Sequence, residues 1–150
     1  MYSAHFFSST EFGEWSEDMS FRLITLLDVL RYRCGSRIQI SKSPYALGRR
    51  LGLDSQSCHN VDMWGEILAA DCFVEHVYGR MQVAGIVELA SLLGFTGIGI
   101  YPQWKNNQGE TQCGFHFDVR PTREMGDPAT WSFFNGEFHA IEHGLGMIDA

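Results

Sequence analysis

Residues 94–120 read GFTGIGIYPQWKNNQGETQCGFHFDVR, and this stretch decides the fold class. Apolar residues at every second position over 98–102 predict a strand, and the glycines between them predict close approach by neighbouring segments. Residues 105–112 are polar and predict a hairpin loop. Residues 114–120 alternate again and predict the partner strand. Two strands joined by one short loop favour antiparallel pairing.

Four further segments carry a regular pattern. Apolar residues at helical spacing predict helices over residues 17–33 and 77–93, and a glycine follows each of them. Alternation or a short apolar run predicts strands over residues 37–41 and 66–73. Residues 42–57 contain glycines and a proline and predict a long loop. We therefore expect an α+β fold, with helices packed on one face of a small antiparallel sheet.

Bulk properties restrict the class of protein further. At 150 residues, 45% of them hydrophobic, the chain predicts one domain over 1–150, with a tail at 120–150 that no pattern places. A net charge of −7 argues against a nucleic-acid binder, which needs a clustered basic face. No apolar run is long enough to span a membrane, and residues 1–15 contain no secretory signal. The four cysteines form no C-x-x-C pair, so we expect reduced, buried thiols.

Histidine and aspartate residues stand where they can converge. His116 lies in the middle of a predicted strand, and Asp118 points to the same face because strand side chains alternate. If the strand that contains Asp71 is its neighbour, His59, Asp71 and His116 can meet. Two imidazoles and one carboxylate form a catalytic zinc set with an open fourth position. The alternative is that these are unrelated, hydrogen-bonded structural residues, since the chain has no H-E-x-x-H motif.

The order of several short motifs resembles one family, the M15-type zinc peptidases. These are the D-Ala-D-Ala carboxypeptidases and L-alanyl-D-glutamate endopeptidases, and the resemblance extends over residues 6–121. SCH (57–59) with AAD (69–71) is similar to the family's S-x-H … A-x-D signature, and GFHFDVRP (114–121) is similar to its H-x-D-x-R strand. GFTGIGIYPQW (94–104) and FFSSTEF (6–12) resemble segments of its smaller, phage-borne branch.

The resemblance implies a fold, a metal and a reaction. The family fold is the small α+β fold shared with Hedgehog signalling domains, an antiparallel sheet flanked by helices. His59, Asp71 and His116 would be the ligands of Zn²⁺, and Arg49 would hold a substrate carboxylate through a bidentate contact. The implied reaction is hydrolysis of a peptide bond in the stem or cross-bridge of bacterial peptidoglycan.

The chain departs from the family pattern at two points. The gap between His59 and Asp71 is longer than in the common signature, which leaves Asp62 as a rival third ligand. Several family members place an acidic general base three residues before the last His, where this chain has Cys113, and a thiol is a poor proton acceptor. The candidate replacements are Glu110, Asp118, His139 and His143.

Three of these residues have open alternatives. Asp118 could orient His116 or pair with a nearby arginine instead of accepting a proton. Arg49 could be a solvated surface residue. Trp64 and Tyr101 could line the cleft or belong to the core or its rim.

The leading hypothesis is a phage-encoded zinc peptidase that degrades bacterial peptidoglycan, as a lysis enzyme or a virion component. Its partners would be peptidoglycan and other virion proteins, with no nucleic acid and no membrane. We expect it to be made in the host cytoplasm and to act at the cell wall or in the phage particle. The alternative, motivated by Cys113, is a non-enzymatic phage structural or wall-binding protein with the peptidase fold. A third hypothesis is a metal-free domain with coincidental histidines.

Overall fold

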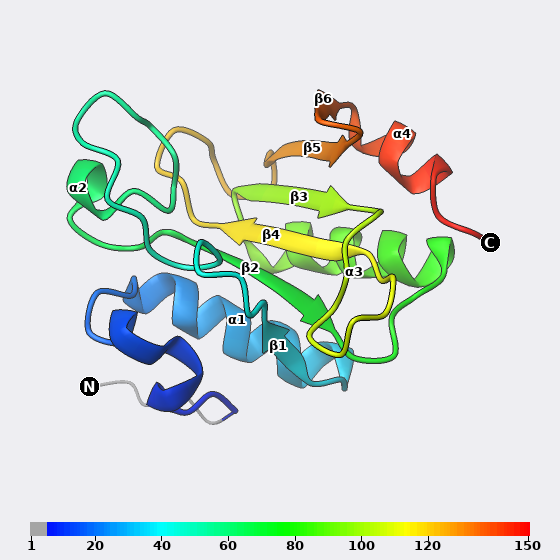
Figure 1. Ribbon diagram of the computed structural model, residues 1–150, viewed down its shortest axis with the longest axis horizontal. Helices are drawn as coiled ribbons and strands as arrows, with labels where there is room; N and C mark the ends of the chain where they lie inside the picture. Colours follow the sequence, from blue (N-terminus) through cyan, green and yellow to red (C-terminus); the bar gives the residue numbers. More distant parts are fainter. Residues whose placement is uncertain (1–5) are drawn as a thin grey trace.

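The computed structural model describes residues 6–150 as an α+β protein with six strands and five helices (Figure 1). The expectation about a secretory signal concerned residues 1–15, and residues 1–5 of that segment lie outside the described part. No helix of the described part is both long and apolar enough to cross a membrane. The elements are η1 (Ser9–Trp15), α1 (Phe21–Cys34), β1 (Ile38–Ile40), α2 (Val61–Trp64), β2 (Ala69–Val74), α3 (Arg80–Leu93), β3 (Gly97–Tyr101), β4 (Gly114–Asp118), β5 (Ala129–Phe134), β6 (Glu137–His139) and α4 (Ile141–Gly146).

The strands form one sheet in the order β1-β2-β4-β3-β5-β6. The predicted β3–β4 hairpin is confirmed, and every neighbouring pair is antiparallel except β3 and β5. The expected antiparallel sheet is therefore found only in part, because the sheet is mixed and contains one parallel pair. Gly97 at the start of β3 is opposite both Asp118, the last residue of β4, and Ala129, the first of β5. After β4 the chain thus crosses over at the start of β3, and β5 then runs along the other side of β3, parallel to it.

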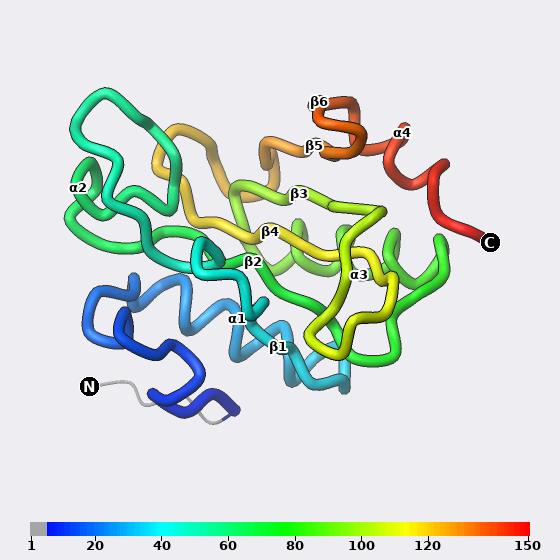
Figure 2. The backbone as a smooth tube through the Cα atoms, in the orientation of Figure 1, coloured from blue at the N-terminus to red at the C-terminus, as the bar shows by residue number. Residues whose placement is uncertain are grey.

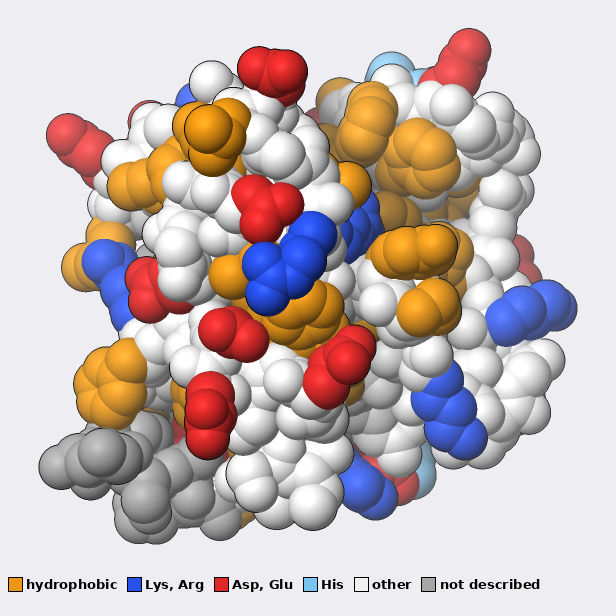
Figure 3. Space-filling model, turned by 60° about the vertical axis from the view of Figure 1, so that its left-hand side comes forward, with side chains coloured by type: hydrophobic (Ala, Val, Ile, Leu, Met, Phe, Trp, Pro, Cys, Tyr) orange, Lys and Arg blue, Asp and Glu red, His pale blue; other side chains and the backbone are white. Residues whose placement is uncertain are grey.

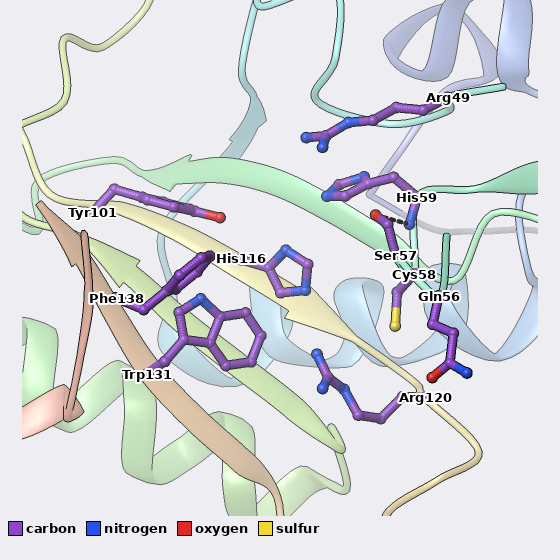
Figure 4. Close-up of a pocket in the computed structure, with 10 residues that line it drawn as sticks. All are labelled: Arg49, Gln56, Ser57, Cys58, His59, Tyr101, His116, Arg120, Trp131 and Phe138. Carbon is purple, nitrogen blue, oxygen red and sulfur yellow. Dashed lines mark hydrogen bonds between the residues drawn. The ribbon is translucent and has the colours of Figure 1, made fainter. Parts of the chain in front are cut away.

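The two long helices, α1 and α3, contact each other and cover one face of the sheet (Figures 1 and 4). Strand alternation sends the apolar side chains of β3 and β4 into this core, and the largest of them are fully buried. These are Ile98, Ile100, Phe115 and Phe117. The residues that alternate with them along the strands, including His116 and Asp118, therefore project from the opposite face, where the candidate site lies.

Both long helices begin later than the apolar periodicity predicts, because capping groups decide their starts. Ser20 accepts a hydrogen bond from a backbone N–H in the first turn of α1, at 3.3 Å. The Gln82 side chain accepts from two backbone N–H groups that precede α3, each at 3.0 Å. The predicted helix ends are confirmed, since Gly35 and Gly94 follow with φ of 70° and 109°, a left-handed conformation that glycine adopts without strain.

The tail that the sequence left unplaced completes the sheet. Figure 2 traces it from β5, beside β3, through the β5–β6 hairpin to α4. The hairpin turns at Asn135 and Gly136, both with positive φ. Helix α4 packs on β5, where Gly144 leaves room for the side chain of Ser132.

The net charge of −7 is visible on the surface. On the face drawn in Figure 3, acidic side chains gather near the centre, while basic side chains are scattered among hydrophobic ones. Arg50 pairs with Asp62 at 3.2 Å and lies over the ring of Trp15. These exposed contacts contribute little to stability.

Candidate metal centre

Three side chains predicted to converge do lie together, on the sheet face opposite α1 and α3 (Figure 4). Asp71 of β2 is paired in register with His116 of β4, so their side chains are neighbours on one face. His59 precedes α2, and its carbonyl accepts a hydrogen bond from the backbone N–H of Arg49 at 2.8 Å. One possible ligand atom from each of the three residues lies within 4.8 Å of the others.

The spacing of these atoms fits a small metal ion. Asp71 Oδ1 is 3.1 Å from His116 Nδ1 and 3.5 Å from His59 Nε2. Two ligand atoms at about 2.05 Å from a tetrahedral Zn²⁺ are roughly 3.3 Å apart, between those two distances. The three side chains are only 4–7% exposed. The group could therefore hold a metal ion.

The tautomer of His59 is fixed from outside the centre. Its Nδ1 is 2.6 Å from the carbonyl oxygen of Leu47, and because a carbonyl only accepts, Nδ1 carries the proton. Nε2 then presents a lone pair, yet it is buried and has no hydrogen-bond partner among the described residues. A buried, unsatisfied polar atom in a native fold calls for an explanation, and a metal ion at this position would provide one.

His116 is oriented by Asp118, which is fully buried. Asp118 Oδ2 is 2.7 Å from His116 Nε2 and 2.6 Å from Nη2 of Arg120, and Oδ1 accepts from Nε and the backbone N–H of Arg120. The close approach of this carboxylate requires glycine at position 97, where a side chain would overlap it. Asp118 thus contacts both His116 and an arginine, the two partners that the sequence left open. It also turns His116 Nδ1 towards Asp71.

The charges of the centre are strongly coupled. Burial disfavours the charged form of Asp71, but the hydrogen bond from His116 and the closeness of both imidazoles outweigh it and lower the pKa of Asp71 to about 2. Burial likewise opposes the charged form of His116, yet its hydrogen bonds to Asp118 and Asp71 raise its pKa to about 9. The pKa of Asp118 is lowered against burial by His116 and Arg120. Without a metal ion, His116 is therefore an imidazolium at neutral pH.

The centre opens into a cavity of about 500 Å³ (Figure 4). Arg49 lines this cavity, with its side chain 31% exposed and Nη2 3.7 Å from Asp71 Oδ2. The guanidinium is thus near the centre and partly free to meet a ligand. On the other side of His116, Arg120 also lines the cavity.

The structure separates the other candidate residues from the centre. Glu110 lies in the β3–β4 loop and lines a different cavity, with Glu75. Asp62, the rival ligand, pairs with Arg50 and accepts from the backbone N–H of Gly52. His139 and His143 lie in β6 and α4, and neither lines the cavity at the centre.

Cys113 immediately precedes β4, and its thiol is closed to the cavity. Burial raises its pKa to about 12, so it is a neutral thiol. The other cysteines are also free thiols, as expected, and only Cys34 is more than slightly exposed.

An aromatic wall that sequence reasoning missed closes one side of the cavity. Trp131 of β5 lies 4.9 Å from the ring of His116, and Phe138 of β6 is beside it (Figure 4). Gly99 of β3 makes room for the indole, and this glycine was the available signal, although its partner lay in the unplaced tail. Tyr101 lines the cavity, whereas Trp64 donates a hydrogen bond to Ser57 and lies outside it.

Comparisons of the chain with protein-family models, with curated proteins and with solved structures find no match. The fold and the site therefore define the protein as an α+β protein with a mixed six-stranded sheet and a buried His-Asp-His group.

Proposed function

We propose that the protein is a phage-encoded, zinc-dependent peptidase that hydrolyses a peptide bond in bacterial peptidoglycan. The observation that carries the proposal is the buried group of His59, Asp71 and His116, whose ligand atoms converge beside an open cavity. The ordered motifs that resemble the D-Ala-D-Ala carboxypeptidase and L-alanyl-D-glutamate endopeptidase family support the choice of substrate. A sheet with two helices on one face is compatible with the Hedgehog-like fold of that family. We include this fold assignment in the proposal.

In this proposal His59 Nε2, a carboxylate oxygen of Asp71 and His116 Nδ1 would hold Zn²⁺, beside the cavity. When bound, Zn²⁺ polarises a carbonyl group and lowers the pKa of a coordinated water molecule. The carbonyl of Leu47 and the carboxylate of Asp118 keep both imidazoles in the tautomers that ligation needs. Because His116 is protonated without metal, it would have to give up the proton on Nδ1 to serve as a ligand.

Arg49 and Asp118 have distinct roles in this proposal. Arg49 is near the centre and partly exposed, so its guanidinium is available to a substrate carboxylate. Asp118 is already engaged by His116 and Arg120 and is closed to the cavity, so we assign it to positioning His116. Glu110 lines another cavity, so the proposal gives it no contact with the reacting group.

Metal content and peptide release test the proposal. We expect about one zinc per chain, and release of peptides from purified peptidoglycan that a chelator stops and added zinc restores. His59→Ala should lose both metal and cleavage. The matched control is Asp62→Asn, since this acid follows His59 closely but pairs with Arg50 outside the centre. A purified protein without bound metal and without chelator-sensitive cleavage would refute the proposal.

A second candidate function is a non-enzymatic wall-binding or structural protein of a phage particle. The observation that favours it is the cavity lining, in which the described residues place no carboxylate other than the centre's own. Under this alternative the protein binds zinc and sediments with purified peptidoglycan, yet releases no peptide. Association with other virion proteins, measured by pull-down from phage particles, would support the structural role.

A further inference from the structure

Tyr101, the last residue of β3, directs its hydroxyl group into the cavity beside the His59–Asp71–His116 centre. Figure 4 shows the phenol directed into the cavity, towards the space between Arg49, His59 and His116. This hydroxyl has no hydrogen-bond partner within the described part of the chain, in contrast to the oxygens of Asp118. It is therefore free to bind a ligand that enters the cavity.

The phenol ring is held in this position by its neighbours. It stacks on Trp104 with ring centroids 3.8 Å apart and planes at 2°, and the edge of Phe133 lies 6.5 Å away. Trp104 in turn lies over Gly114, where a side chain would overlap it, and beside Phe73 at 6.0 Å. Rotation of Tyr101 would break this stack, so the hydroxyl is preorganised rather than adaptable.

The hydroxyl is a donor at neutral pH. A phenol has an ordinary pKa of about 10. Burial and then the negative charge of Asp71 raise the pKa of Tyr101 above that value, although Arg49 opposes the shift. The group therefore keeps its proton and can offer it to a negatively charged oxygen beside the centre.

We propose that Tyr101 donates a hydrogen bond to an oxyanion bound at the His59–Asp71–His116 centre, and thus stabilises the charge that develops on the substrate carbonyl oxygen during peptide hydrolysis. The inference rests on the proposed metal centre. Among the lining groups, Arg49 is paired with Asp71 and Ser57 accepts from the backbone N–H of His59 at 3.3 Å. The Tyr101 hydroxyl is an unengaged neutral donor, and it points into the space beside the centre. Removing one such donor lowers kcat about 10²- to 10³-fold in enzymes that rely on it.

The test uses Tyr101→Phe, which keeps the ring and its stack on Trp104, in the 150-residue chain loaded with cobalt. The probe is acetohydroxamate, an anionic oxygen ligand, and its Kd is read from the visible spectrum of the cobalt. Because the variant loses a hydrogen bond to a charged group, we expect the Kd to rise at least about tenfold. The matched control is Tyr32→Phe, since this exposed tyrosine of α1 lies outside the cavity.

Each outcome of this experiment has a defined meaning. Equal cobalt content and a Kd within about twofold of wild type in Tyr101→Phe overturn the inference, since a tenfold change corresponds to 1.4 kcal/mol. A higher Kd for Tyr101→Phe, at equal metal content and unchanged melting temperature, supports the inference. Weaker binding in a protein that releases no peptide supports Tyr101 as the donor and counts against the peptidase proposal alone. A wild-type protein that loads no metal overturns both.

Discussion

Replacing Asp118 by asparagine separates two roles for the most buried acid of the site. Asp118 accepts from His116 Nε2 at 2.7 Å and from Arg120 Nη2 at 2.6 Å, and it is not exposed. Asparagine has nearly the same shape, but it carries no charge, and one of its two polar atoms becomes a donor that faces another donor. A positioning residue and a proton acceptor respond differently to this change.

For the positioning role, the expected loss is in metal affinity. Substitution of the partner that orients a metal-ligating histidine lowers affinity about 10- to 100-fold, which agrees with about 1.5–3 kcal/mol for a charge-assisted hydrogen bond. The metal-free protein should also lose stability, because Arg120 loses its buried partner. A fully buried broken pair costs about 3–5 kcal/mol, and we expect about 2 kcal/mol here because the Arg120 side chain is 25% exposed.

Two measurements decide between the roles. Competition with a chromophoric chelator gives the Kd for zinc, and urea unfolding of the chelator-treated protein gives the free energy of unfolding. Asp62→Asn, which also neutralises an acid near His59, is the control and should change neither value by much. An unchanged Kd for zinc combined with lost peptide cleavage would refute the positioning role and make Asp118 the proton acceptor.

Three further predictions concern other parts of the site. Because the pKa of His116 is raised to about 9, its contribution to the stability of the metal-free protein is complete below about pH 6.5 and is lost as the pH rises through about 9. Zinc affinity should rise over the same range, and melting curves with and without zinc check both trends. Gly99→Ala should destabilise the protein by about 1–3 kcal/mol, because its Cβ would lie 2.5 Å from a fixed indole ring. Gly85→Ala, in an open helical position, should be neutral or stabilising in the same urea titration. Arg49→Ala should raise KM about 10- to 100-fold with a smaller change in kcat, whereas Arg50→Ala should leave peptide-release kinetics unchanged.

The parts of the fold that could be predicted from sequence are those that local patterns specify. Alternation around the polar loop at 105–112 was enough for the β3–β4 hairpin, and the glycines after both long helices marked their ends. The placement of β5 could not be predicted, because its pairing with β3 is parallel and depends on the path from residue 119 to 128. Without β5 and β6, the aromatic wall of Trp131 and Phe138 had no predicted position.

For the candidate site too, local patterns identified the residues but not the contacts that bring them together. The alternation of strand side chains placed His116 and Asp118 on one face, and the motif order singled out His59 and Asp71. Whether β2 and β4 are neighbours is a non-local fact that spacing cannot supply, and it is this register that brings Asp71 to His116. The bond from His59 to the carbonyl of Leu47 was equally out of reach, since any residue supplies a carbonyl.

The charges around the centre favour an anionic ligand. Without metal, two carboxylates (Asp71 and Asp118), two guanidinium groups (Arg49 and Arg120) and the His116 imidazolium sum to +1. If Zn²⁺ replaced the imidazolium proton, this sum would rise to +2 in a largely buried group, which would be costly unless an anion entered the cavity. A substrate that carries a carboxylate near its scissile bond would supply that charge. The centre should therefore prefer acidic peptides to neutral ones, a preference that follows from charge alone.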